Sequence, residues 1–263
     1  MTDYLLQLHH LNITDSNGNY FIRNLNLDIL KDNVNVLIGQ SGSGKSLTAS
    51  VLVQQYPSAL TVSFDSYLYH QQPIDNVKRL LGNKIGYISQ NYAYSFNDHT
   101  KLKKQLLAIY RTHRKVSKQE AQQQIKRALG WVNLDSTEIL EKYRFMLSGG
   151  QLERVYIASV LMLEPELIIA DEPTAALDVI NGKRIMDLIQ HIAKEHHTTL
   201  LLITHNLSHV LKYADYINII KNGEMVEQGS ANYFKTAKLQ PYTQQLFNAR
   251  SQLIRKGDHH AET

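Results

Sequence analysis

Two stretches near the amino terminus alternate apolar and polar residues, and a polar turn separates them. Residues 4–13 and 21–29 show this alternation, which is typical of half-buried antiparallel strands. The segment between them, Asp15-Ser16-Asn17-Gly18-Asn19, has the composition of a turn. We therefore expect the chain to begin with an antiparallel hairpin.

Later apolar runs predict strands of a different kind. They cover residues 34–38, 60–64, 85–89, 167–171 and 199–204. Several are almost continuously apolar, as parallel strands covered on both faces usually are. Helical patterns alternate with them over residues 46–55, 151–163 and 179–196. This alternation predicts a wound α/β sheet.

The pattern changes between residues 91 and 146, where strand signals are absent. Lys, Gln and Ala become frequent, and apolar residues recur at helical spacing, as at Leu102, Leu106 and Ile109. We expect a helical insert here, within one domain that spans residues 1–263. Its α/β core then comprises residues 1–90 and 147–230, and residues 231–263 form a tail whose end is polar.

A glycine-rich loop follows the predicted strand at residues 34–38. Its sequence, Gly39-Gln40-Ser41-Gly42-Ser43-Gly44-Lys45-Ser46, fits the phosphate-binding pattern G-x-x-x-x-G-K-[ST], in which the Lys reaches the β- and γ-phosphates and the hydroxyl binds Mg²⁺. The glycines let backbone N–H groups face phosphate oxygens, and the following helix adds its positive dipole end. We count Leu47, the next residue, with the nucleotide-binding candidates. The loop predicts a nucleoside triphosphate but does not choose between kinase, GTPase, helicase and transporter motor.

Two carboxylates, Asp171 and Glu172, end the apolar run at residues 167–171. The carboxyl edge of a sheet is where α/β proteins bind ligands. Asp171 could hold Mg²⁺ through a water molecule, and Glu172 could accept a proton from an attacking water. A positioned base of this kind typically contributes ~10²–10⁴-fold to the rate. The alternative is a solvated acidic pair that closes a strand.

Residues 147–151, Leu147-Ser148-Gly149-Gly150-Gln151, form a small turn ahead of a predicted helix, which is a second potential anion site. With this turn the chain resembles the nucleotide-binding subunits of ABC transporters. The motifs of that family occur here in the family's order: the loop 39–46, Gln90 after a strand, residues 147–151, Asp171-Glu172, Ala176-Leu177-Asp178, and Thr204-His205. The resemblance covers about residues 4–230 and predicts an ABC ATPase fold, with a P-loop core of mixed sheet, an antiparallel β subdomain and a helical subdomain.

The resemblance also implies a role for each matching residue. Lys45 and the loop backbone would bind the ATP phosphates, and Ser46 and Gln90 would bind Mg²⁺ together with Asp171. Glu172 would polarise the attacking water, and His205 would contact the γ-phosphate. The turn at residues 148–151 would contact ATP held by a second subunit, and Asp178 would lie at the seam between the subunits.

ATP binding would therefore close a dimer and hydrolysis would release it. Family members of this kind work with two membrane permeases and, indirectly, an extracytoplasmic solute-binding protein, at the cytoplasmic face of the cell membrane. A heterodimer of two related ATPase chains is favoured over a homodimer. The segment after Gln90 would receive the permease, with Tyr92, Tyr94 and Phe96 as apolar contacts.

Two segments resemble the importer ATPases for peptides and nickel in particular. One is NYAYSFN at residues 91–97, which lacks the two prolines usual there, and the other is QPYTQQL at residues 240–246. The predicted cargo is an oligopeptide, or nickel, alone or as a metal–chelator complex. The aromatic residue on which the family stacks adenine has no clear equivalent, because Tyr20 and Phe21 fit a strand core better.

The amino-acid composition argues against several other kinds of site and partner. The 263 residues contain no cysteine, which excludes disulfides, thiolate metal sites and iron–sulfur clusters. The formal charge is +4 without a dense Lys/Arg run, so a nucleic-acid partner is not expected. No stretch approaches the ~20 apolar residues of a membrane span, and the first residues lack a signal-peptide pattern. Three His-His pairs are expected to be surface or strand-edge residues rather than a metal site.

Three rival classes stay open at this point. A soluble ABC ATPase of translation would usually carry two ATPase units, and one of DNA repair would carry a long coiled-coil insert. The ATPase of an ABC exporter would usually have a different C-terminal pattern or a fused membrane domain. A non-enzymatic binding module is the least favoured class, because each expected phosphate and water contact has a matching residue.

Overall fold

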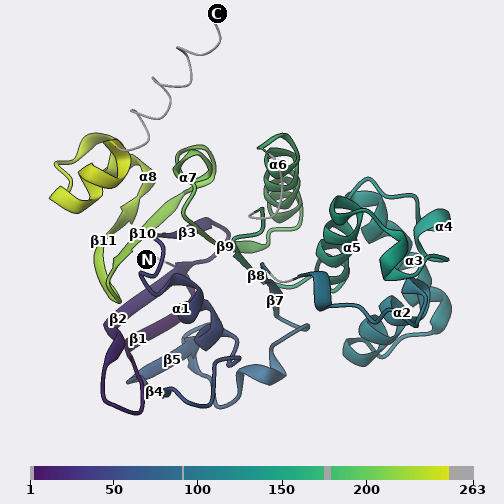
Figure 1. The fold of residues 1–263 in the computed structure, drawn as a ribbon, viewed down its shortest axis with the longest axis horizontal. Coiled ribbons are helices and arrows are strands. Elements are labelled where there is room, and N and C mark those ends of the chain that lie inside the picture. Colours follow the sequence, from purple (N-terminus) through teal and green to yellow (C-terminus); the bar gives the residue numbers. More distant parts are fainter. Residues whose placement is uncertain (1–2, 91, 175–178, 249–263) are drawn as a thin grey trace, which may run out of the picture. The chain divides into compact units, whose positions relative to one another are not determined.

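The computed structural model describes residues 3–90, 92–174 and 179–248. The chain divides into two compact units, which we describe separately. The first unit is built from residues 1–75 and 201–263, and the second from residues 76–200. Figure 1 shows the elements of both units coloured along the sequence.

The first unit contains an antiparallel sheet whose strand order is β2-β1-β5-β6, with β4 also paired to β1. Its strands are β1 (Tyr4–Thr14), β2 (Tyr20–Leu30), β4 (Thr61–Ser63), β5 (Ser66–Tyr69) and β6 (Gln72–Pro73). The turn between β1 and β2 is organised by Asp15, whose carboxylate accepts the N–H groups of Asn17 and Asn19 at 2.8 and 2.9 Å. The predicted hairpin is therefore confirmed, and hydrogen bonds from Asn19 hold the pKa of Asp15 below its usual range.

A second group of strands in this unit carries the phosphate loop. The strand β3 (Val34–Ile38) is fully buried and continues through the loop into α1 (Lys45–Leu52). β10 (Tyr216–Lys221) pairs in parallel with β3 and antiparallel with β11 (Glu224–Ser230). The unit also contains the end of β9 (Thr199–Thr204) and the helices α7 (Leu207–Tyr213) and α8 (Ala231–Thr236).

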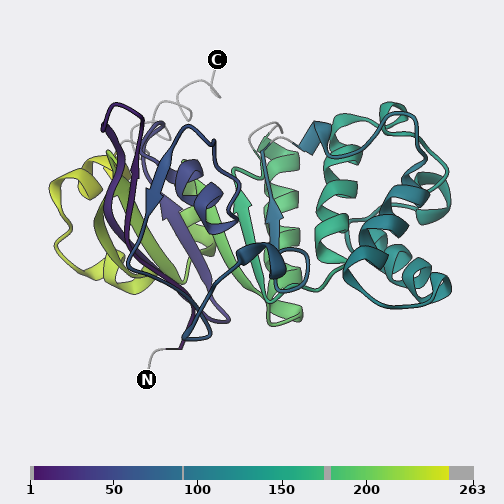
Figure 2. The same cartoon turned by 90° about the horizontal axis from the view of Figure 1, so that it is seen from below.

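The second unit joins two parallel strands to a group of helices. β7 (Ile85–Ile88) pairs in parallel with β8 (Leu167–Asp171). The α-helices of this unit are α2 (Leu102–His113), α3 (Lys118–Trp131), α4 (Ser136–Ile139), α5 (Gly149–Leu161) and α6 (Val179–Glu195). Short 3-10 helices are η1 (Val77–Arg79), η2 (Tyr92–Tyr94) and η3 (Arg144–Met146). Figures 1 and 2 both show α2 to α5 gathered in one group.

Local sequence signals fix several of these helix starts. Ser117 and Glu120 form a reciprocal capping box at α3, with Ser117 N–H donating to the Glu120 carboxylate at 2.8 Å. Buried apolar residues of the helices, among them Leu102, Leu106 and Ile125, recur at helical spacing as predicted.

Most predicted strands and helices are confirmed within a few residues, and several elements were missed. The missed strands are β5, β6, β10 and β11. Residues 92–146 are helical or irregular among the described positions, and no strand is assigned to them. The division of the core, insert and tail into parts of one domain stays a prediction. Within the described ranges, no helix has the length and apolar character needed to cross a membrane.

Candidate functional site: a nucleotide-binding loop and its partner motifs

The phosphate loop lies in the first unit, tightly packed against β10. A Cβ added to Gly39 would lie 2.2 Å from the backbone oxygen of Ile220, so a larger residue would force the backbone apart. Gly44 has φ +103° and caps α1 without a side-chain hydrogen bond. The start of the loop is thus fixed by close backbone packing. Its end leads into the first turn of α1, whose backbone N–H groups could bind an anion.

Lys45 is 7% exposed, and its ammonium donates to the carbonyl oxygens of Gly39 and Gln40 at 2.9 Å each. The Ser43 hydroxyl is buried and has no hydrogen-bond partner among the described residues. An unpaired buried hydroxyl and a helix start without a side-chain cap are groups that a phosphate chain would satisfy, and the Lys45 ammonium adds a positive charge to the same loop. The loop therefore fits the nucleotide predicted from its sequence.

His205 lies in the same unit, directly after β9. Its side chain is exposed. The preceding residue, Thr204, accepts the N–H of Asn206 on its hydroxyl at 3.0 Å, which turns the chain before α7 begins at Leu207. The strand end and this turn present His205 at the carboxyl edge of β9.

The two predicted acidic residues belong to the second unit, at the carboxyl end of β8. Asp171 is 5% exposed, and the Tyr87 hydroxyl donates to its carboxylate at 3.5 Å. Burial, followed by the nearby Asp171 charge, raises the pKa of Tyr87 above its usual range. Glu172 has φ +47°, a left-handed conformation that is uncommon outside glycine and that often marks functional positions.

Gln90 is exposed and follows β7 in the second unit. One side chain of α5, Tyr156, contacts the chain on both sides of it. The Tyr156 hydroxyl accepts the N–H of Ser89 at 3.2 Å and donates to the Tyr87 carbonyl at 3.1 Å. Its ring stacks on Tyr92 with a centroid distance of 6.4 Å. Sequence reasoning missed Tyr156, because its partners come from a strand that is distant in the sequence.

The predicted signature turn begins α5, also in the second unit. Ser148 is the N-cap residue, and its hydroxyl accepts the Gln151 N–H at 3.2 Å. The Gln151 side chain accepts the Ser148 N–H at 3.1 Å, which completes a capping box. Gly149 and Gly150 form the first turn of the helix. The S-x-x-Q spacing in the sequence is the local signal for this cap.

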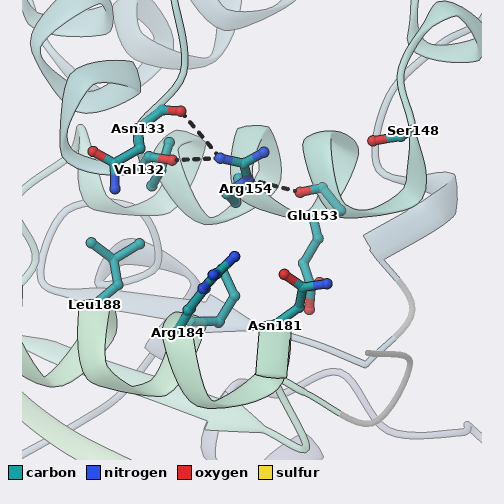
Figure 3. A pocket seen from close by; sticks show the side chains of 10 residues that line it. Val132, Asn133, Ser148, Glu153, Arg154, Asn181, Arg184 and Leu188 are labelled. Carbon is teal, nitrogen blue, oxygen red and sulfur yellow. Dashed lines mark hydrogen bonds between the residues drawn. The ribbon is translucent and has the colours of Figure 1, made fainter. Parts of the chain in front are cut away.

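Beside this turn lies a cavity of about 510 Å³ in the second unit, lined by residues of α5 and α6 and by Val132 and Asn133, which follow α3. The Arg154 guanidinium donates to the carbonyls of Gly150, Val132 and Asn133 at 3.1 to 3.3 Å. Figure 3 shows Glu153 extending from α5 towards Asn181 on α6. One Glu153 oxygen, Oε2, is buried and has no hydrogen-bond partner among the described residues.

The buried carboxyl of Glu153 gives a pH-dependent stability prediction. Burial raises the pKa of Glu153 from 4.5 to about 7. Between these values only the unfolded chain ionises, so the free energy of unfolding falls as pH rises from 4.5 to 7, by at most about 3 kcal/mol. Glu153→Gln cannot ionise and should therefore be more stable than the wild type at pH 8 but not at pH 5. Urea unfolding of both proteins at the two pH values measures this, and an equal difference at both would contradict it.

The structure contradicts the expected burial of three aromatic residues, and some other candidates lie outside the described residues. Phe96 is 4% exposed, so it belongs to the core and cannot be a surface contact. Tyr20 and Phe21 are 52% and 48% exposed, so the expectation that they are strand core residues is wrong. Asp178 and residues 249–263 lie outside the described residues.

The candidate residues divide between the two units. The loop 39–47 and His205 belong to the first, and Gln90, residues 148–151, Asp171 and Glu172 belong to the second. Each set lies at the end of a strand or the start of a helix, where polar groups can face a ligand. Sequence reasoning also missed the contact of Tyr242 with the loop: its hydroxyl accepts the N–H of Gln40 at 3.3 Å.

Comparison with known proteins gives the same identification. The sequence profile of a family described as ABC transporter matches residues 22–175. The nickel import system ATP-binding protein NikD of Staphylococcus aureus (strain bovine RF122 / ET3-1) is 55% identical over 251 residues, which is 95% of this chain and 98% of the relative. NikD of strain USA300 is 54% identical over the same shares of both chains.

Solved structures support the fold. CbiO1 from Clostridium perfringens, described as part of the ABC transporter complex cbiONQ, has a TM-score of 0.75 at 28% identity and covers 89% of this chain and 92% of its own. A dimeric ATP-binding cassette in a post-hydrolysis state has a TM-score of 0.71 at 24% identity, covering 86% and 98%. The predicted fold class is therefore confirmed. The chain belongs to the ABC transporter family, as an ATP-binding subunit that hydrolyses ATP.

Proposed function

We propose that this chain is the ATPase subunit of an importer for nickel, taken up as the ion or as a metal–chelator complex. The observation that carries the proposal is 55% identity, over 95% of the chain, to a protein named as the ATP-binding component of a nickel import system. The QPYTQQL tail agrees with an importer for nickel or peptides, and this similarity makes nickel the favoured cargo. An exporter or a soluble ABC ATPase is not favoured by such relatives.

The nucleotide would be held by Lys45 and by backbone N–H groups of residues 39–47, apart from those of Gln40 and Ser43, which donate within the protein. Ser46, Gln90 and Asp171 supply hydroxyl, amide and carboxylate oxygens, which are the hard ligands that Mg²⁺ prefers. Bound Mg²⁺ would neutralise charge on the phosphate oxygens. The side chains would then orient the phosphates, and Lys45 would stabilise the negative charge that spreads over the γ-phosphate oxygens during transfer.

Glu172 is proposed to position and deprotonate the attacking water, and His205 to contact the γ-phosphate. The left-handed backbone at Glu172 supports a role in which the carboxylate must be held in one direction. The capping box at Ser148 occupies the Gln151 N–H and fixes the first turn of α5, so the N–H groups of Gly149 and Gly150 are prearranged for an anion. In our proposal that anion is the γ-phosphate bound by a second subunit, and Asp178 lies at the seam.

The partners are proposed to be a second ABC ATPase chain, in a heterodimer rather than a homodimer, and two permeases at the cytoplasmic face of the membrane. An exposed aromatic surface in the second unit supports a permease contact. Tyr94 and Phe145 are 85% and 69% exposed. The Arg144 guanidinium of η3 lies 6.0 Å from the Tyr94 ring of η2, and it pairs at 2.7 Å with Asp98 in the segment that follows η2.

Uptake of nickel by cells that lack this gene tests the proposal. Restoring the wild-type gene should restore accumulation of ⁶³Ni, whereas a labelled oligopeptide should enter equally with or without it. Tyr94→Ala should lose uptake but keep the ATPase activity of the purified subunit, because Tyr94 lies on the exposed surface. Tyr233→Ala, another exposed tyrosine, is the matched control. Gene-dependent peptide uptake without nickel uptake would reject the cargo.

A further inference from the structure

The C-terminal tail is docked on the first unit by specific contacts. Gln240 donates its N–H to the Glu227 carboxylate at 3.2 Å and its side-chain amide to the Val226 carbonyl at 2.9 Å. Phe247 stacks on Phe234 of α8 with a centroid distance of 6.1 Å. The segment after Gln240 is helical over residues 241–248. These contacts give the importer-type tail a fixed position on β11 and α8.

One residue of this tail, Tyr242, reaches the phosphate loop. Its side chain is 9% exposed, and its hydroxyl accepts the N–H of Gln40, the second residue of the loop, at 3.3 Å. The Lys221 ammonium lies 4.7 Å from the Tyr242 ring, within the range of a cation–π contact. Lys221 ends β10 and follows Ile220, whose carbonyl crowds Gly39. The tail and β10 therefore hold the start of the loop together.

The backbone carbonyl of Gln40 is hydrogen-bonded to Lys45. It accepts Lys45 Nζ at 2.9 Å and the Ser43 N–H at 3.2 Å. Gln40 thus receives a contact from the tail on its N–H and from the loop's own cation on its carbonyl. A continuous chain of hydrogen bonds runs from Tyr242 through Gln40 to Lys45.

We infer that Tyr242 is a positioning residue for nucleotide binding, through which the C-terminal tail holds the phosphate loop in its binding conformation. The inference rests on the proposed role of residues 39–47. A loop that is already ordered loses less conformational freedom when it closes around phosphates, so the ligand binds more tightly. The Tyr242 hydroxyl bonds a backbone group of the loop and not a residue proposed to act in hydrolysis, and its effect should therefore fall on affinity rather than on the chemical step.

The test compares Tyr242→Phe with Tyr233→Phe in the full chain. Both substitutions remove one tyrosine hydroxyl from the C-terminal part. The Tyr233 hydroxyl bonds Glu227 Oε1 and not the loop, and the Gln240 N–H that anchors the tail donates to the other oxygen, Oε2, so Tyr233→Phe keeps that anchor. Loss of one hydrogen bond should weaken binding of the fluorescent analogue TNP-ATP, and raise the KM for ATP, by about twofold to tenfold, with kcat nearly unchanged. Tyr233→Phe should leave both at wild-type values. Tyr242→Leu, which also removes the ring over Lys221, should weaken binding further.

Hydrogen exchange distinguishes a local loosening of the loop from a general loss of stability. Amides of a peptide covering residues 39–44 should exchange faster in Tyr242→Phe, while β1 and β2 keep wild-type protection. Equal binding and equal loop exchange in Tyr242→Phe and Tyr233→Phe would overturn the inference. Lys45→Ala is measured in parallel to separate the positioning role of Tyr242 from the nucleotide-binding role of residues 39–47. If Lys45→Ala bound TNP-ATP as the wild type does, the role of the loop itself would be rejected.

Discussion

Glu172→Gln is expected to bind ATP normally and to hydrolyse it at least ~10²-fold more slowly, since a positioned base contributes ~10²–10⁴-fold. The substitution keeps the size of the side chain and removes its ability to take a proton. The backbone at Glu172, with φ +47°, is equally accessible to Gln, so the local structure should persist. Release of inorganic phosphate by the purified protein, with and without its partner ATPase, measures the loss.

The same variant should also accumulate a closed dimer. If ATP joins two subunits and hydrolysis separates them, a protein that binds without turnover stays joined. Light scattering after gel filtration in ATP should show the dimer for Glu172→Gln and not in ADP. Glu195→Gln is a matched control, because Glu195 is a half-exposed carboxylate on α6 of the same unit. Wild-type hydrolysis by Glu172→Gln would remove Glu172 from its proposed role.

Lys45→Ala should have the largest effect on nucleotide affinity. Lys45 is 7% exposed and bound to two carbonyls of the loop, so its ammonium is held within the loop rather than in solvent. Hydrogen bonds to a charged group contribute about 1.5–3 kcal/mol, and their loss should weaken ATP binding by about 10- to 100-fold. The Gly39 and Gln40 carbonyls would lose the same donor, which should loosen the start of the loop. Calorimetric titration with ATP measures the affinity.

Two further variants test whether the loss of ATP affinity is specific to Lys45 and to its ammonium group. Lys31→Ala removes a partly exposed lysine of the same unit, which lies 3.8 Å from Asp3 at the surface, and should bind ATP as the wild type does. Lys45→Arg keeps the positive charge in a planar, bulkier group that cannot replace a compact ammonium, and we expect weak binding. Unchanged affinity in Lys45→Ala would mean that the loop does not hold the phosphates through this residue.

The sequence alone predicted the parts of this protein whose cause is local. The run Val34–Ile38, the glycine-rich loop and the following helix are contiguous, and each has its own pattern. The turn at residues 147–151 ahead of α5 and the carboxylates at the end of β8 are likewise set by neighbours within a few residues. Such features depend on backbone geometry and periodicity, which short stretches of sequence encode.

The hairpin of β10 and β11 had a local signal that was missed. Asn222 and Gly223 join the two strands, both with positive φ, and Asn-Gly between apolar runs is the usual sequence of a two-residue hairpin turn. This hairpin supplies Ile220, whose carbonyl crowds Gly39. Recognising it from the sequence would have given the strand, but not its place beside β3.

The side chains that support the site were established by contacts between elements that are distant in the sequence. Phe96 was expected at the surface and is buried, whereas Tyr20 and Phe21 were expected in the core and are about half exposed. Tyr242 contacts Gln40 across 202 positions of sequence, and Tyr156 contacts Ser89 across 67. A side chain's burial and partners depend on which elements pack against it, and that packing is set by the whole chain rather than by its neighbours in sequence. The sequence therefore determined the nucleotide motifs, and the fold determined which distant residues hold them in place.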